Sequence, residues 1–197
     1  MTPFRDSALP PGTLERARSG DPGAHEAIYR VFEVPVRTLA RRLVPRRAAA
    51  DDLAQDVFVE VLTRLSQFDG RGSFAGWVRA ITVNRCLMHL RSPWQRARHA
   101  LDVDGAHAWV DPAAEQAAQD RGRRLDLERA LARLGPTPRV VVWLHDVEGY
   151  THAEIGALFG ATASFSKSQL ARAHERLRGL LEPDGVASTC MPVSTNC

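Results

Sequence analysis

The chain has few of the features that mark secreted, membrane-spanning or metal-dependent proteins. No apolar run approaches the roughly 20 residues that a transmembrane helix needs, and the N-terminal stretch MTPFRDSALPPG lacks the apolar core of a signal peptide. Three cysteines, Cys86, Cys190 and Cys197, are too few and too scattered for a disulfide framework. These absences argue against a disulfide-rich secreted domain and predict a cytoplasmic protein with no membrane insertion.

The chain also lacks a strong excess of charge of either sign. Its 197 residues carry 26 basic and 23 acidic side chains, a net charge of +3, which excludes a histone-like polycation. Lys167 is the only lysine, so arginine supplies nearly all of the positive charge. Arginine suits bidentate recognition of phosphate and guanine, but a compositional bias of the source genome explains the same skew.

Apolar residues recur at helical spacing in the first half of the chain. The run over residues 21–44 is interrupted by Pro35, which we expect to break or kink the helix. A long helix is predicted over residues 50–66, where apolar residues recur every fourth position. Ser73 is expected to cap a further helix that ends near Arg91. The residues of that helix expected to point inward are Phe74, Trp77, Ile81 and Met88.

The second half begins with a stretch that keeps no periodicity. Residues 93–122 mix Pro, Asp and Ala and predict a flexible linker. Helices resume at residue 123; Thr137 and Pro138 favour a helix start and Gly149 an end. We therefore expect an all-α fold of two small helical domains, residues 21–92 and 123–182, joined by that linker. The remaining segments, residues 1–20 and 183–197, are predicted to be flexible and disordered.

Residues 151–178 predict two short helices around a tight turn. Thr151 and Glu154 form a capping box, Gly160 ends the first helix, and Thr162 can cap the second. In the second helix the residues expected to face inward are Leu170, Ala173, Leu177 and Leu181, and those expected to face outward are Lys167, Ser168, Ala171 and Arg172. Short side chains beside long cationic ones suit a helix that enters the DNA major groove, although helical hairpins without DNA-binding function share this pattern.

The predicted helix of residues 50–66 carries an acidic stripe, Asp52, Asp56 and Glu60, spaced four residues apart. Because like charges at this spacing repel slightly, the stripe indicates either a surface that docks on a basic partner or an ordinary solvated face. Neither a histidine nor a further acid accompanies it as a catalytic or metal site would need. We therefore expect no enzymatic activity and no cofactor.

A glycine-rich loop, FDGRGS, separates this helix from the next one. Its two glycines permit a left-handed backbone conformation, and aromatic and cationic residues follow: Phe74, Trp77, Arg79, Arg85, His89 and Arg91. Asn84 can contact base edges. This arrangement can accept an unstacked base, as in proteins that bind single strands; the alternative is a plain turn with Trp77 in the core.

Two long segments together resemble a known family. DDLAQDVFVEVLTRLSQFDGRGSFAGWVRAITVNRCLMHLR resembles the core-binding and −10-binding helices of bacterial σ factors. RALARLGPTPRVVVWLHDVEGYTHAEIGALFGATASFSKSQLARAHERLRGLL resembles their −35-binding module. With only these two modules, spanning about residues 20–182, the chain resembles the extracytoplasmic-function (ECF) class of the σ70 family. The resemblance implies a subunit that binds core RNA polymerase and directs it to promoters.

The same resemblance assigns roles to individual residues. It implies that Asp52, Gln55 and Asp56 bind the β′ clamp helices of core polymerase, with the second domain on the β flap. It implies −10 contacts by the loop residues Phe68, Asp69, Gly70, Arg71, Gly72 and Ser73 together with Asn84. It implies −35 contacts by Lys167, Ser168, Ala171 and Arg172. Most members of the class are held inactive by an anti-σ partner, so such a partner is expected here.

Some features leave alternatives open. Ser164-Phe165 stands where the family usually has Gly-Thr, so Phe165 either packs inward or lies against the DNA sugar edge. Cys190 and Cys197 are two exposed thiols of the predicted tail, an incomplete metal site or incidental residues; we expect no metal. The rival functions are a dimeric helix-turn-helix repressor or activator, recognised by half-sites about one helical turn apart, and a helical adaptor without DNA binding.

Overall fold

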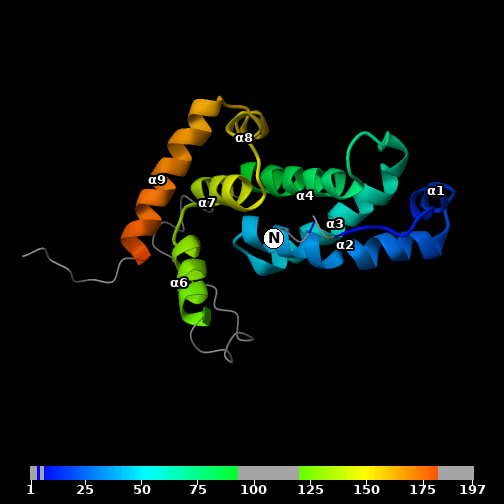
Figure 1. Ribbon diagram of the computed structural model, residues 1–197, viewed down its shortest axis with the longest axis horizontal. Coiled ribbons are helices and arrows are strands. Elements are labelled where there is room, and N and C mark those ends of the chain that lie inside the picture. Colours follow the sequence, from blue (N-terminus) through cyan, green and yellow to red (C-terminus); the bar gives the residue numbers. More distant parts are fainter. Residues whose placement is uncertain (1–3, 5–6, 93–119, 182–197) are drawn as a thin grey trace, which may run out of the picture.

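A computed structural model describes Phe4, residues 7–92 and residues 120–181, and all regular secondary structure in these ranges is helical (Figure 1). The first domain contains α1 Thr13–Arg18, α2 Pro22–Leu43, α3 Arg47–Thr63, the 3₁₀ turn η1 Leu65–Gln67 and α4 Phe74–Arg91. The second contains α6 Asp120–Ala132, α7 Pro136–Val142, the π-helical turn η3 Trp143–Val147, α8 His152–Phe159 and α9 Ala163–Leu181. The predicted linker up to residue 119 and the tail with Cys190 and Cys197 lie outside the described residues and stay predictions.

The long helix α2 forms the centre of the first domain and contacts α1, α3 and α4. Asp21 caps its start by accepting a hydrogen bond from the backbone N–H of Gly23 at 2.9 Å. Of the two outcomes expected at Pro35, a break does not occur, because α2 continues through it to Leu43. Pro35 and its neighbours Val36 and Leu39 are buried, so tertiary packing compensates for the one hydrogen bond that proline cannot donate.

The N-terminal region is more ordered than we expected from its composition. Helix α1 packs against α2, with Thr13 and Ala17 buried. Phe4 is also buried, and its ring stacks on Phe32 at 6.4 Å between centroids. The prediction of a flexible segment over residues 1–20 therefore does not hold for the part that the structure describes.

The second domain is built on α7 and α9, and α6 and α8 also pack against α9. Its first helices begin earlier than predicted. Helix α6 starts at Asp120, inside the range assigned to the linker, and α7 is capped by Gly135 with Pro136 at the first helical position, so Thr137 is not the cap. Gly149, with a φ of 75°, follows the end of η3 as predicted.

The helix-turn-helix forms as the sequence predicted. Both hydrogen bonds of the Thr151–Glu154 capping box are present, and Gly160 ends α8 in the left-handed conformation with a φ of 63°. Gly156 of α8 packs against the backbone of the turn that leads into α9. A Cβ atom at this position would come within 2.7 Å of the backbone carbon of Thr162, so the turn requires a glycine there.

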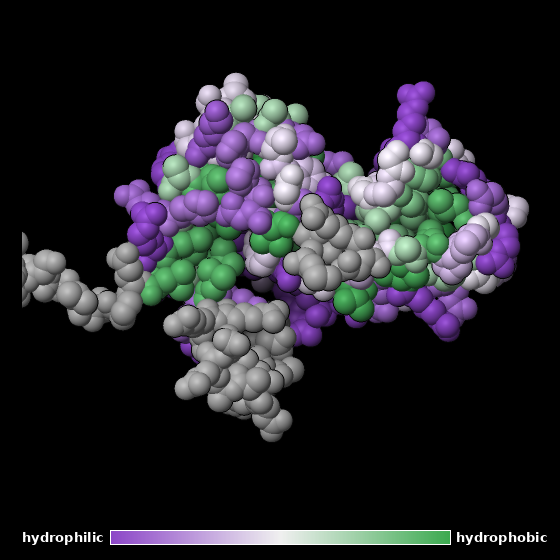
Figure 2. Space-filling view, viewed as in Figure 1, coloured by the Kyte–Doolittle hydropathy of each residue, from purple (hydrophilic) through white to green (hydrophobic). Residues whose placement is uncertain are grey.

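Two residues expected to point inward are exposed instead. Met88 of α4 is 65% exposed and Leu181 of α9 is 42% exposed, whereas Leu170, Ala173 and Leu177 are buried as predicted. Figure 2 shows hydrophobic residues gathered where α6 and α9 meet, and Leu127 of α6 is also 42% exposed. The described residues thus leave an apolar patch at this end of the second domain.

The two domains contact each other directly. Helix α7 packs against α2, and α8 packs against α4 (Figure 1). The surfaces that the sequence assigned to polymerase and DNA binding are therefore placed relative to one another by this contact.

Candidate nucleic-acid interface

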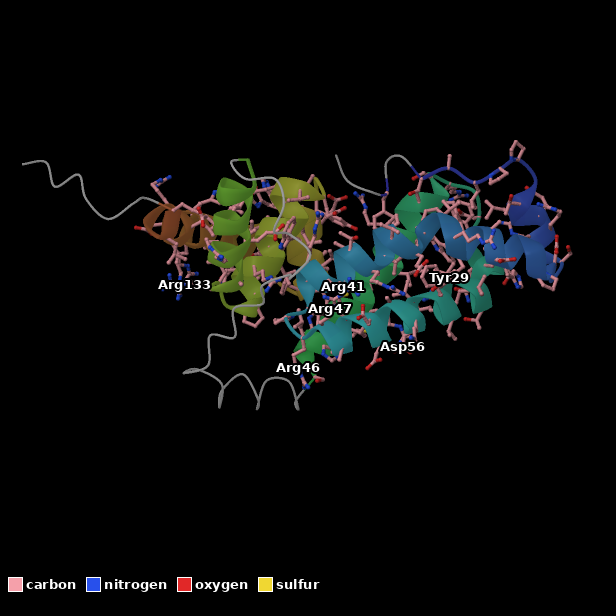
Figure 3. The ribbon with its side chains drawn as sticks, turned by 90° about the horizontal axis from the view of Figure 1, so that it is seen from below. Tyr29, Arg41, Arg46, Arg47, Asp56 and Arg133 are labelled. Carbon is pink, nitrogen blue, oxygen red and sulfur yellow. The ribbon has the colours of Figure 1, made fainter. Side chains whose placement is uncertain are left out.

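The outward face of α3 presents the polar residues assigned to polymerase docking in the sequence analysis. Asp52, Gln55 and Asp56 are exposed, and Figure 3 shows Asp56 pointing away from the rest of the molecule. Val59 continues the same face one turn later and is 64% exposed. An exposed apolar side chain beside exposed carboxylates provides both contact area and charge to a partner surface. Val59 was missed because only charged and polar side chains were considered for docking; its position four residues after Gln55 was the signal that would have identified it.

The neighbouring acids are held within the first domain. Arg41 forms a bidentate pair with Asp51, with Nε–Oδ1 and Nη2–Oδ2 distances of 2.9 and 3.1 Å. Glu60 pairs with Arg64 at 2.6 Å and with Arg85 of α4. Burial alone raises the pKa of the Glu60 carboxyl, but its hydrogen bonds and charge interactions with Arg85 and Arg64 outweigh burial and hold that pKa below its ordinary value. The predicted three-residue stripe is thus reduced to Asp52 and Asp56.

The glycine-rich loop before α4 adopts the backbone conformation that its glycines permit. Gly70 and Gly72 have φ values of 80° and 84°. Asp69 accepts a hydrogen bond from the backbone N–H of Arg71 at 2.9 Å, and the Arg71 side chain is 93% exposed. Ser73 caps α4 by accepting from the Gly76 N–H at 3.0 Å. Residues 69–73 are all exposed, so this part of the loop is accessible to a partner.

Phe68 differs from the other predicted residues of the loop because it is buried. Its ring packs against Phe74 and Trp77, with centroid distances of 5.3 and 5.6 Å. The backbone carbonyl of Phe68 accepts a hydrogen bond from Arg18 of α1. Phe68 therefore anchors the loop to the aromatic core. Trp77 is half-buried in the same cluster, which fits the alternative in which Trp77 packs in the core.

One side of α4 runs on from the loop, half-buried at Trp77 and exposed at Asn84, Met88 and Arg91. We call it the α4 stripe: Trp77, Asn84, Met88 and Arg91, whose spacings of seven, four and three residues place them on one side of the helix. Asn84 was predicted from its side-chain chemistry. Met88 was missed because it was assigned to the core; its position one turn after Asn84 was the signal that would have identified it.

The outward face of α9 also matches the sequence expectation. Lys167, Ser168, Ala171 and Arg172 are all exposed. Arg172 donates from Nε to the backbone carbonyl of Ser168 at 3.2 Å. Phe165 lies against Phe159 of α8, with 5.6 Å between the ring centroids. Of the two positions expected for Phe165, it therefore takes the one packed inward, within the helix-turn-helix.

Three histidines around Asp146 connect the parts of the second domain. Asp146 contacts His145 Nδ1 at 2.8 Å and His174 Nε2 of α9 at 2.6 Å, so it joins η3 to α9. His152 stacks on His145 at 4.4 Å and contacts the buried Ser166 hydroxyl at 3.1 Å. Desolvation and the charges of His145 and Lys167 lower the pKa of His152. Among the described residues, no set of three or more His, Cys, Asp or Glu side chains is arranged to hold a metal ion.

Comparison with known proteins identifies both halves of the chain. Sigma-70 region 2 matches residues 28–98, and Sigma-70, region 4 matches residues 124–177. The ECF RNA polymerase sigma factor SigE of Mycolicibacterium smegmatis is 33% identical over 177 residues, covering 87% of this chain and 68% of SigE. CarQ of Myxococcus xanthus, an RNA polymerase sigma factor, is 31% identical over 172 residues, covering 85% of this chain and 95% of CarQ. The chain belongs to the ECF class of the σ70 family.

This σ factor also shares its fold with solved members of the family. The sigma factor RpoE of Bartonella quintana, in complex with the anti-sigma factor NepR, superposes with a TM-score of 0.58 at 24% identity, covering 81% of this chain and 98% of RpoE. CnrH, in complex with the cytosolic domain of CnrY, gives a TM-score of 0.52 at 22% identity, with coverages of 88% and 97%. Membership of this family supports function as an RNA polymerase σ factor, rather than as a dimeric regulator or a helical adaptor without DNA binding. No helix in the described ranges combines the length and apolarity of a membrane span.

Proposed function

We propose that this σ factor uses three separate surfaces as a non-enzymatic subunit of RNA polymerase. Asp52, Gln55 and Asp56 of α3 bind the clamp helices of the β′ subunit. The loop of residues 68–73 and the α4 stripe bind the −10 element, and the outward face of α9 binds the −35 element. The observation that carries this proposal is the contrast on α3, where Asp52 and Asp56 are exposed while Asp51 and Glu60 are paired with arginines.

The geometry of the −10 surface supports capture of an unstacked base. The positive φ angles of Gly70 and Gly72 shape an exposed loop that Phe68 fastens to the aromatic core. Asn84 and Met88 continue the surface along α4 with one polar and one apolar side chain. Holding a flipped base offsets an unstacking cost of a few kcal/mol without ATP.

Two further partners follow from the same proposal. The second domain binds the flap of the β subunit, which places α9 over the −35 element. An anti-σ factor holds the chain inactive, as RpoE and CnrH are found in complexes with NepR and CnrY. Because the two domains bind DNA weakly when separate, the polymerase raises their combined affinity by fixing their separation, an effective-concentration gain.

The test is charge reversal at the docking residues. Asp52→Lys with Asp56→Lys should weaken binding to core polymerase while leaving helix content and thermal stability unchanged, because both side chains are exposed. Glu15→Lys with Glu26→Lys, at exposed positions of α1 and α2 outside the three surfaces, is the matched control with the same change in charge. Binding is measured by co-purification with core polymerase. Wild-type yield for the docking variant would refute the role of α3.

A further inference from the structure

Titratable side chains gather at one edge of the outward face of α9. We call His145, His152, His174 and the carboxylate of Asp146 the histidine cluster. His174 lies seven residues, about two helical turns, after Lys167, so both lie on the same side of α9. His145 and Asp146 belong to η3, and His152 begins α8, which packs against α9 (Figure 1). Three elements therefore bring these groups to the edge of the proposed −35 surface.

Each ring of the cluster uses one nitrogen within the protein. Asp146 lies 2.8 Å from His145 Nδ1 and 2.6 Å from His174 Nε2, and the buried Ser166 hydroxyl lies 3.1 Å from His152 Nδ1. The second nitrogen of each ring has no hydrogen-bond partner among the residues that the structure describes. The His145 and His174 side chains are 33% and 46% exposed, so an external group can reach both rings.

The pairing with Asp146 determines what the second nitrogen can bind. An ionised carboxylate only accepts hydrogen bonds, so in a neutral ring the nitrogen that faces Asp146 carries the hydrogen. The other nitrogen of that neutral ring is then an acceptor and cannot bind a phosphate oxygen. Only the protonated ring of His145 or His174 donates to Asp146 and to a phosphate at the same time. A phosphate contact at either ring therefore requires an added proton.

The cluster has little negative charge to stabilise such protons. Asp146 is shared between two rings, and the rings of His145 and His152 stack at 4.4 Å between centroids, so charging both is unfavourable. Desolvation and the charges of His145 and Lys167 lower the pKa of His152, although Asp146 raises it. A DNA phosphate would supply the anion that the cluster needs to hold a second proton.

Among the described residues, Asp146 is the only carboxylate that forms an ion pair with the cluster. Charged groups on the helices packed against α9 are engaged elsewhere. Glu154 of α8 is bound within the capping box, and Arg139 of α7 donates to a backbone carbonyl of α2. Arg129 of α6 pairs with Asp126 at 3.4 Å. The charged residues of α9 that follow His174 are Glu175, Arg176 and Arg178, all exposed.

We infer that the histidine cluster is a proton-dependent phosphate contact of the −35 surface, made through the second nitrogens of His145 and His174. The inference rests on the proposed −35 role of α9. A helix that enters the major groove is flanked by phosphates, and the cluster lies at one edge of that helix. Because binding takes up protons, affinity for DNA rises as the pH falls. The gain is complete where the free rings are already protonated, and it is lost as the pH rises through the range where the bound rings release their protons.

The first experiment measures the affinity of the full chain for a short fluorescent duplex of mixed sequence, by anisotropy at low salt. A cognate promoter is not needed, because phosphate contacts carry no sequence information. The pH runs from about 8 to about 6, on both sides of the ordinary imidazole pKa of about 6.5. Each proton taken up raises affinity by up to tenfold per pH unit, so we expect a gain of about tenfold over this range. A flat profile would overturn the inference.

Histidine replacements locate the protons. His145→Gln with His174→Gln removes both proton-dependent rings and should flatten the profile. The matched control leaves the cluster intact and replaces the four other histidines by glutamine, at His25, His89, His99 and His107. It should keep the wild-type profile. Circular dichroism at each pH verifies that the variants stay folded. A wild-type profile in the cluster variant would overturn the inference.

A permanent cation provides a second variant. His174→Lys can pair with Asp146 and with phosphate without an added proton. It should therefore bind DNA more tightly than the wild type at the high end of the pH range and about equally at the low end. Weaker binding than the wild type at both ends would contradict a phosphate contact at this position.

The salt dependence shows whether the protons act through phosphate. Each phosphate contact changes the slope of log affinity against log salt concentration by about 0.9. The wild-type slope should steepen by about one contact from the high to the low end of the pH range, and that of His145→Gln with His174→Gln should not. A pH-dependent affinity with a constant salt slope would mean that protonation acts only on the packing of α9, and it would overturn the contact.

Failure of the underlying −35 assignment gives a different result. Lys167→Ala with Arg172→Ala should weaken duplex binding at every pH if the outward face of α9 is the binding surface. Unchanged binding in this variant would contradict the −35 role of α9 and the inference with it. Weaker binding in this variant, together with a flat wild-type pH profile, would contradict the histidine contact alone.

Discussion

Helices α4 and α9 both face DNA in the proposed function, yet they are supported in different ways. Helix α4 is packed against α2, α3 and α8, and buried residues occupy most of its circumference. Helix α9 buries one stripe, Leu170, Ala173 and Leu177, and leaves a wide outward face. In the proposed function, the −35 helix is therefore displayed freely, while the −10 helix also takes part in the contact between the domains.

The largest predicted effect is a loss of stability at Gly156, because the position of α9 against α8 depends on this residue. Gly156→Ala should destabilise the second domain by about 2–3 kcal/mol, since its Cβ would meet the Thr162 backbone at 2.7 Å and overpacking costs about that much. Thermal unfolding followed by circular dichroism measures the change. Gly179→Ala, in α9 with no atom within 4 Å of its Cβ, is the control and should be neutral or slightly stabilising.

A second prediction separates base contact from phosphate contact on α9. Arg172→Ala should cost about 1–3 kcal/mol on the specific −35 sequence if it contacts a base bidentately. Lys167→Ala should weaken binding to all sequences and reduce the slope of affinity with salt by about one phosphate contact. Titrations of holoenzyme with specific and scrambled −35 DNA distinguish them. Equal losses on both sequences for Arg172→Ala would mean that it only positions the helix.

The corresponding prediction for α4 concerns promoter melting. Asn84→Ala should reduce open-complex formation by about 1 kcal/mol, the worth of one hydrogen bond, and leave −35 affinity unchanged. Permanganate reactivity of promoter thymines in the holoenzyme reports melting. Thr63→Ala, an exposed polar position at the end of α3, is a suitable comparison. If both variants melt DNA like the wild type, Asn84 does not contact the −10 region.

The sequence predicted the helix-turn-helix in most details because its signals are local. The Thr151–Glu154 capping box and the Gly160 stop act within a few residues, and both are present in the structure. Predictions failed where distant packing decides. Pro35 lies within a continuous helix because its neighbours are buried, and the described part of residues 1–20 is held by contacts of Ala17 and Phe4 that no local pattern reveals.

The same distinction applies to the site residues. Spacing predicted that Asp52, Asp56 and Lys167 lie on outward faces, and all three are exposed; their binding roles stay predictions. Spacing could not show that Glu60 is paired with Arg64 and Arg85, nor that Met88 faces outward, because α4 has no single apolar stripe from which an inward side can be read. Pairing and exposure in this helix depend on the other helices packed around it.

The smallest predicted effect concerns Glu148, which pairs with Arg79 of α4. It sharpens the comparison between α4, which lies at the contact between the domains, and α9, whose outward face is free. Burial raises the Glu148 pKa above its ordinary value of 4.5, even though Arg79 and Arg42 lower it. A raised pKa means that contact between the domains favours the protonated carboxyl. This contact is therefore strongest below about pH 4.5 and weakens as the pH rises through the raised pKa.

Glu148→Gln should accordingly stabilise the contact between the domains at neutral pH and remove this part of its pH dependence. The groups facing Glu148 are Arg79 of α4, Arg42 of α2 and Tyr150 of its own domain, none of which changes charge over the acidic range. We expect the ratio of chains with the domains in contact to chains with the domains apart to rise about twofold, or ~0.4 kcal/mol, as measured by the distance between spin labels on the two domains. Glu175→Gln on the exposed side of α9 is the control. A shift toward separated domains for Glu148→Gln would show instead that the ion pair with Arg79 outweighs the cost of burying the carboxylate.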